Sequence, residues 1–151
     1  MRTFESIDDL MDAKGENLGT SSWVEITQDS VNLFADATGD HQWIHVDPEK
    51  AAQGPFGGTI AHGFMTLSLL PRLMAEMYTV NGVKLAINYG LNKVRFPAPV
   101  PVGSKVRAVS TVTGAEALPN DTVQITVSTT VEIEGGAKPA CVAESILRYI
   151  G

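Results

Sequence analysis

The chain has 151 residues, of which 44% are hydrophobic and 19% are charged, so it can fill the core of one globular domain. Its net charge of -6 has the wrong sign for coating a phosphate backbone, which argues against nucleic acid as a partner. Its one cysteine, Cys141, can form no internal disulfide. Because no apolar run is long enough for a membrane span or resembles a secretion signal, we expect a single cytoplasmic domain over residues 1–151, with no membrane partner.

The N-terminal part of the chain predicts two helices separated by a short strand. Within residues 1–19, apolar residues recur at helical spacing, at Phe4, Ile7, Leu10 and Met11. Residues 23–26 are strand-like, and Thr27 then offers an N-cap to a helix over residues 28–37. Gly39 is where that second helix should end.

The next segment, residues 40–46, lies between this stop and the pair Asp47 and Pro48. Aspartate is a good N-cap and proline is favoured at the first helical position, so a further helix should begin at Pro48. We therefore expect residues 40–46 to be extended or irregular.

An apolar helix is predicted from residue 63 to about residue 78. Its apolar residues leave only a narrow polar stripe, and they are Phe64, Met65, Leu67, Leu69, Leu70, Leu73, Met74 and Met77. A helix of this kind should be enclosed by other structure. We expect Pro71 to kink it, because a proline inside a helix removes one backbone hydrogen bond at a cost of about 3 kcal/mol.

The rest of the chain is β in character, with strands predicted over residues 84–96, 104–113, 122–134 and 140–150. The third of these is the clearest, because apolar and polar residues alternate along it. We predict an antiparallel meander curled around the apolar helix, which is a two-layer α+β domain.

Two polar residues after Gly39 suit proton-transfer chemistry. Asp40 and His45 are five residues apart in a segment that need not be helical, so a carboxylate and an imidazole can converge there on one water. The spacing alone leaves a structural interpretation open, because aspartate after glycine is common in caps and turns.

A second candidate is the pair His62 and Gly63 at the start of the apolar helix. Backbone N–H groups in a first helical turn have no intrahelical acceptor, so the N–H of Gly63 can hold an oxyanion. The alternative is that His62 caps the helix and Gly63 permits the turn. We expect no metal site at His41 and His45 with Asp40 or Asp47 as a third ligand, because Gly39 and Pro48 leave no room for a helix that would align the rings.

Three segments together resemble the MaoC-like group of (R)-specific enoyl-CoA hydratases in the hot-dog superfamily. The first reads Gly39-Asp40-His41-Gln42-Trp43-Ile44-His45, similar to the family pattern Gly-Asp-x-Asn-Pro-aliphatic-His, with Gln42 and Trp43 as departures. The second is His62-Gly63-Phe64, and the third is Arg95-Phe96-Pro97-Ala98-Pro99-Val100-Pro101-Val102-Gly103. They follow one another in family order across residues 20–150.

This resemblance implies a hot-dog fold and reversible syn hydration of trans-2-enoyl thioesters. It implies an acyl-CoA or acyl carrier protein thioester as substrate, a homodimer, and no cofactor or metal. The catalytic groups that it implies are Asp40, His45 and the backbone of Gly63, and the candidate substrate-binding residues are Gln42, Trp43, His62 and Phe64.

Two other functions stay open, since hot-dog proteins also include acyl-CoA thioesterases and non-catalytic acyl-binding or partner subunits of 3-hydroxyacyl dehydratases. A thioesterase would release free thiol, whereas hydration removes the conjugated enoyl absorbance without releasing thiol. Activity of the purified homo-oligomer would separate an enzyme from a partner subunit.

Overall fold

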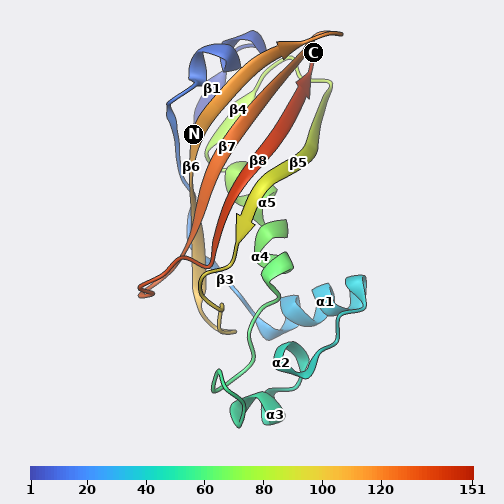
Figure 1. The fold of residues 1–151 in the computed structure, drawn as a ribbon, viewed down its shortest axis with the longest axis vertical. Coiled ribbons are helices and arrows are strands. Elements are labelled where there is room, and N and C mark those ends of the chain that lie inside the picture. The colour runs from blue at the N-terminus through green and yellow to red at the C-terminus, as the bar shows by residue number, and fades with distance from the viewer.

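The computed structural model describes all residues, 1–151, as a long twisted sheet curled around a pair of helices (Figure 1). The sheet contains β2 (Asn17–Thr20), β3 (Val24–Glu25), β5 (Leu85–Arg95), β6 (Lys105–Leu118), β7 (Thr122–Ile133) and β8 (Cys141–Ile150). The helices are α1 (Gln28–Thr38), α2 (Trp43–Val46), α3 (Pro48–Ala52), α4 (Gly63–Ser68) and α5 (Leu70–Met74). The predicted α+β class is confirmed.

The strand order of the sheet differs from the predicted meander. The order is β2-β6-β7-β8-β5, with β3 also paired to β6, so only β6, β7 and β8 follow one another as neighbours. β5 pairs antiparallel with β8 and forms the far edge. Three of the residues that connect β5 to β6 are prolines, which lack the N–H that a hairpin ladder needs, and this connection carries the chain to the opposite side of the sheet.

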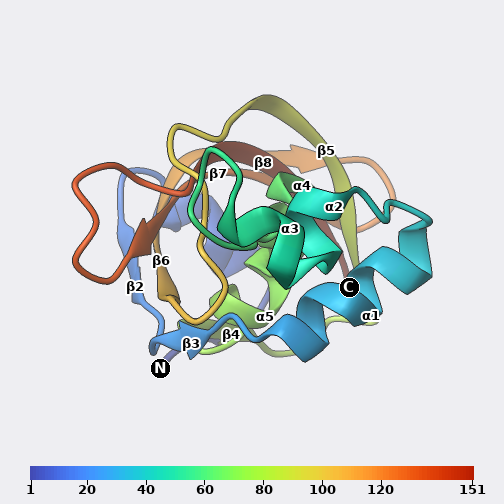
Figure 2. The same ribbon diagram turned by 90° about the horizontal axis from the view of Figure 1, so that it is seen from below.

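The concave face of the sheet holds the core. Along β7 the buried and half-buried residues alternate, as the sequence predicts, and Val123, Ile125, Val127 and Val131 are buried. Figure 2 looks along the molecule and shows α4 and α5 inside the curve of the sheet. Leu70, Leu73 and Met74 of α5 complete the core from the helix side.

The predicted apolar helix is two helices and ends at Met74, before the expected residue 78. The break falls at Leu69, next to Pro71, which occupies the first turn of α5 and has no N–H to donate to the preceding turn. The predicted kink is therefore confirmed. The expected enclosure fails in the first turn, where Phe64 is 70% exposed.

The predicted helix over residues 1–19 is wrong. The chain instead forms β1 (Arg2–Phe4), a 3-10 helix η1 (Asp8–Ala13) and β2, and β1 pairs with β4 (Tyr78–Val80) in a separate two-stranded sheet. The Asp9 carboxylate accepts the N–H groups of Glu5 and Ser6, which turns the chain before a longer helix can form.

The helices α1 and α3 begin where the sequence predicts, and α1 ends at the predicted glycine. The Thr27 hydroxyl accepts the N–H of Ser30 at the start of α1, and Gly39 ends that helix in the left-handed conformation. Asp47 caps α3, with Pro48 as its first residue. No helix in the structure has the length and apolar character needed to cross a membrane.

The single cysteine offers a test of how tightly the sheet packs. Cys141 is fully buried at the start of β8, and burial raises the pKa of its thiol to about 11, against about 8.5 in an unfolded chain. The folded protein therefore keeps a proton that the unfolded chain loses between these pH values. The stability that this group contributes is fully present below about pH 8.5 and is lost as the pH rises towards 11.

We predict that iodoacetamide at pH 8 labels Cys141 slowly in the folded protein and rapidly after denaturant is added, as followed by mass spectrometry. Rapid labelling without denaturant would contradict this packing.

Candidate active site

The candidate site lies where α1, α2 and α3 gather at the N-terminal end of α4, at the bottom of the molecule in Figure 1. Residues 43–46 form the one-turn helix α2, so the expectation of an extended or irregular segment is wrong there. The Asp40 carboxylate accepts the N–H of Gln42, and the N–H of Asp47 bonds to the carbonyl of Trp43, which closes the turn. Asp40 itself stays outside the helix.

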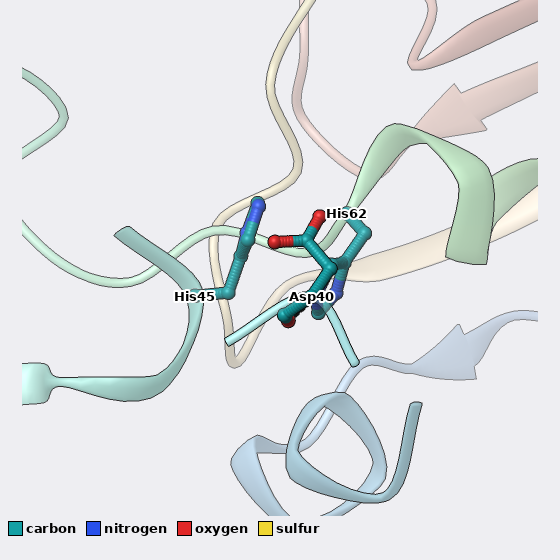
Figure 3. A group of neighbouring side chains, drawn as sticks. All are labelled: Asp40, His45 and His62. Atoms are coloured by element: carbon teal, nitrogen blue, oxygen red, sulfur yellow. Dashed lines mark hydrogen bonds between the residues drawn. The ribbon is translucent and has the colours of Figure 1, made fainter. Parts of the chain in front are cut away.

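Three side chains converge in this region: Asp40, His45 and His62 (Figure 3). One carboxylate oxygen and one ring nitrogen from each histidine lie within 4.8 Å of one another. The structure therefore brings together the pair that the spacing predicts, Asp40 and His45, and adds His62 from the segment before α4. His45 and His62 are buried, while Asp40 is exposed in the single chain.

The orientation of His45 is fixed by a short hydrogen bond. Its Nδ1 lies 2.7 Å from the carbonyl oxygen of Ile60. A carbonyl oxygen can only accept, so Nδ1 carries the proton and donates it. In the neutral ring the lone pair is then on Nε2, which is free to accept a hydrogen bond from a water.

Two residues that the sequence did not single out, Gln28 and Thr59, hold the backbone of His45 through hydrogen bonds. The Gln28 side-chain amide donates to the carbonyl oxygen of His45 at 2.8 Å, and the Thr59 hydroxyl donates to Gln28 Oε1 at 2.6 Å. The N–H of Ile60 bonds in turn to the carbonyl of Ile44 at 3.0 Å. These bonds clamp the backbone on both sides of the bond from His45 to Ile60, and no local pattern in the sequence signals them.

His62 packs against the ring of His45 and bonds to the backbone of Asp40. It is 3% exposed, and its ring packs between Phe34 and His45, with a centroid distance of 3.8 Å to His45 and 23° between the two planes. Its Nε2 donates to the carbonyl oxygen of Asp40 at 2.9 Å, which leaves Nδ1 as a buried lone pair with no partner. This geometry favours a role in holding Asp40 and His45 rather than the substrate contact expected from the sequence.

The stacked rings argue against a metal at this cluster. A metal ion lies close to the plane of each imidazole that binds it, but two nearly parallel rings have planes that do not meet within bonding distance. The other histidine considered for a metal, His41, is at the surface, where a hydrogen bond to Asp36 raises its pKa.

The N–H of Gly63 is the donor nearest to the start of α4. Gly63 is the first residue of that helix, and no group of the protein accepts its N–H. A Cβ at this position would lie 3.1 Å from the ring of Phe96, so the packing of Phe96 leaves little room for a side chain here.

The remaining predicted residues lie around the rim. Gln42 is exposed, and its side chain makes no hydrogen bond within the protein. Trp43 packs against Gly54 beneath the ammonium of Lys50, on the α3 side. Phe64 meets the edge of Phe96 at a centroid distance of 6.1 Å. No side-chain hydrogen bond joins Gln42 or Trp43 to the three clustered side chains, and only the backbone N–H of Gln42 bonds to Asp40.

A cavity of about 720 Å³ lies between the helix pair and the sheet. Its lining is mostly apolar and runs from Leu67, one turn after Gly63, past Met74 to Tyr78 on β4. Neither Asp40 nor His45 lines it. The cavity therefore begins one helical turn beyond Gly63 and extends along α4 and α5.

Comparisons with known proteins agree with this geometry. The family model described as "MaoC like domain" matches residues 9–134. The chain is 77% identical over 150 residues to the 3-hydroxyacyl-thioester dehydratase Z of Mycobacterium tuberculosis, with 99% of each chain covered, and 44% identical over 143 residues to nodulation protein N of Rhizobium leguminosarum, covering 93% of this chain and 89% of that one. It also resembles the structure of an (R)-hydratase from A. caviae involved in PHA biosynthesis, with a TM-score of 0.70, 26% identity, and 89% and 94% of the two chains covered.

The hydrogen bonds predict different tautomers for the two histidines. We expect neutral His45 to carry its proton on Nδ1 and neutral His62 to carry its proton on Nε2, because each faces a backbone carbonyl. Long-range proton–nitrogen NMR spectra distinguish the two forms, and the variants His45→Gln and His62→Gln assign the signals. Detection of His45 protonated on Nε2 alone would refute its bond to Ile60.

Proposed function

The chain belongs to the MaoC-like dehydratase family of hydro-lyases, and we propose that it is an (R)-specific enoyl-thioester hydratase. It adds water reversibly and syn to a trans-2-enoyl thioester, which gives the (R)-3-hydroxyacyl thioester. The observation that carries this proposal is the convergence of the Asp40 carboxylate with a ring nitrogen of His45, together with the bond from His45 Nδ1 to Ile60 that leaves Nε2 as the accepting nitrogen of the neutral ring. The names of two relatives, a 3-hydroxyacyl-thioester dehydratase and an (R)-hydratase, describe the two directions of such a reaction.

The substrate sets two chemical requirements. The β-carbon of an enoyl thioester is electrophilic only through conjugation with the carbonyl, so the addition of water builds negative charge on the thioester oxygen as an enolate. The enzyme must therefore activate a water and stabilise an oxyanion. Neither requirement calls for a metal or a cofactor.

Asp40 and His45 meet the first requirement. Both present acceptors, so they take the two hydrogens of one water and leave an oxygen lone pair for the β-carbon. As the new C–O bond forms, one of the two accepts a proton from the water and the O–H bond breaks, and the pair then passes that proton to the α-carbon of the enolate. Water oxygen and proton arrive from the same side, which makes the addition syn.

Gly63 meets the second requirement. Its N–H has no acceptor in the protein and lies at the positive end of α4, beside the cluster. A hydrogen bond from this N–H to the thioester oxygen becomes stronger as negative charge develops on that oxygen. One such donor stabilises the transition state by about 3 kcal/mol. The adjoining cavity then receives the acyl chain.

We also infer that two copies of the chain pair through β5. This strand is the edge of the sheet, and its outer backbone groups have no partner. Its exposed side chains are largely apolar, namely Leu85, Ile87, Tyr89 and Leu91. Because β5 leads into Phe96, which packs on Gly63, a second copy on this edge would lie close to the start of α4. The thioester itself is carried by coenzyme A or by an acyl carrier protein.

We expect Asp40→Asn and His45→Gln each to lower kcat by about 100-fold or more, because each replaces a base with an amide that cannot take up the water proton. Loss of enoyl absorbance from trans-2-butenoyl-CoA measures the rate, and chiral analysis of the product checks the (R) configuration. His41→Gln is the matched control, since His41 is exposed and bonds only to Asp36. Full activity in either site variant, or release of free thiol, would count against the hydratase assignment.

Tyr89→Asp should convert the dimer to a monomer of 16.1 kDa, because it replaces an exposed aromatic ring with a charged side chain on the strand edge that the second copy would cover. Light scattering after size exclusion measures the mass. Leu33→Asp is the control, since Leu33 on α1 is 69% exposed and lies away from β5. A monomeric parent protein would overturn the pairing.

A further inference from the structure

The cavity beside α4 and α5 is not a purely apolar chamber. Three of its lining residues, Ser145, Leu147 and Tyr149, alternate along one face of β8, so polar groups stand at two levels with an apolar residue between them. Ser145 and Tyr149 are four positions apart along the strand, which is about 13 Å at the rise of a strand. Tyr78 on β4 joins Tyr149 at the far level, away from Gly63.

At the far level, Tyr78 and Tyr149 are both buried and their hydroxyls bond to each other. Two hydroxyls carry two protons, and a single hydrogen bond between them uses only one. The structure gives neither hydroxyl another partner. One O–H is therefore left without a protein acceptor, whichever of the two is the donor.

At the near level, Ser145 is 7% exposed and its hydroxyl makes no hydrogen bond within the protein. A second O–H donor thus lines the cavity partway along β8. A plain alkyl chain that filled this space would shut both donors away from water without an acceptor, which is unfavourable for each. A chain that carries an oxygen acceptor at the right level would avoid that cost.

We propose that the preferred acyl group carries a hydrogen-bond-accepting oxygen, such as a keto or ether oxygen, on the distal part of a long chain. The Tyr78 and Tyr149 pair recognises it, and Ser145 serves a chain with its oxygen nearer to the thioester. The length of the acyl chain follows from the fold. Gly63 and Met74 are eleven residues apart on α4 and α5, or about 16 Å along the helix axis, and the two tyrosines lie farther from Gly63 than Met74 does. This inference rests on the proposed acyl-thioester substrate.

Binding tests the inference without turnover. Titration calorimetry compares hexadecanoyl-CoA with analogues that carry one keto group at successive carbons of the distal half of the chain. We expect at least one analogue to bind about tenfold more tightly than the plain chain, which corresponds to one satisfied hydrogen bond. Equal affinity for the plain chain and every analogue would overturn the proposal.

The tyrosine variants give a pattern that simple destabilisation would not. Tyr78→Phe or Tyr149→Phe alone leaves one hydroxyl with one free O–H, so each single variant should keep the keto preference. Only the double variant removes the donor, and it should lose the preference about tenfold. A double variant that is folded by circular dichroism and keeps the preference would contradict the proposal.

The variant Ser145→Ala tests the near level without changing the tyrosines. It also provides a test if the double tyrosine variant does not fold. It should weaken binding of analogues with the keto group nearer to the thioester and leave the preference for the most distal group. An equal effect on all analogues would contradict the assignment of two levels. Hydration of trans-2-butenoyl-CoA without any keto preference counts against this inference alone, whereas a keto preference without hydration counts against the proposed reaction.

Discussion

The site depends on one hydrogen bond, from Nδ1 of His45 to the carbonyl oxygen of Ile60. Ile60 belongs to the strand-like segment that leads into α4, whereas His45 belongs to α2, so the bond joins two parts of the chain that meet only in the folded state. It fixes both the direction of the ring and the nitrogen that keeps a lone pair. If His45 rotated, the water-binding face would be lost although every residue of the motif was present.

The second histidine, His62, fixes the position of Asp40 in a similar way. His62 holds the backbone of Asp40 through Nε2 and supports the ring of His45 from behind. Gln28 and Thr59 brace the opposite side. Asp40 and His45 are therefore kept in place by directed hydrogen bonds to backbone carbonyls. Such support keeps a site organised before the substrate arrives, so little reorganisation is needed when charge develops.

Local signals in the sequence predicted much of the fold and the chemistry. Thr27 and Gly39 predicted the bounds of α1, alternation predicted β7, and the spacing of Asp40 and His45 predicted two side chains that the structure brings together. The hot-dog fold is confirmed by the likeness to solved structures. Interactions between segments far apart in the chain could not be predicted from local patterns in the sequence. The pairing of β5 with β8 and the bracing by Gln28 depend on tertiary placement, and β1 formed because β4 offered a partner to residues with helical spacing.

The edge strand β5 has a consequence for the newly made chain. An uncovered strand of eleven residues with apolar side chains is a template on which any extended segment can grow, and that is how fibrillar aggregates start. The ladder between β5 and β8 shifts register twice, between Asn88 and Gly90 and between Leu91 and Lys93. These irregularities twist the edge away from flatness, so it accepts a curved, closely matched neighbour and resists indiscriminate stacking.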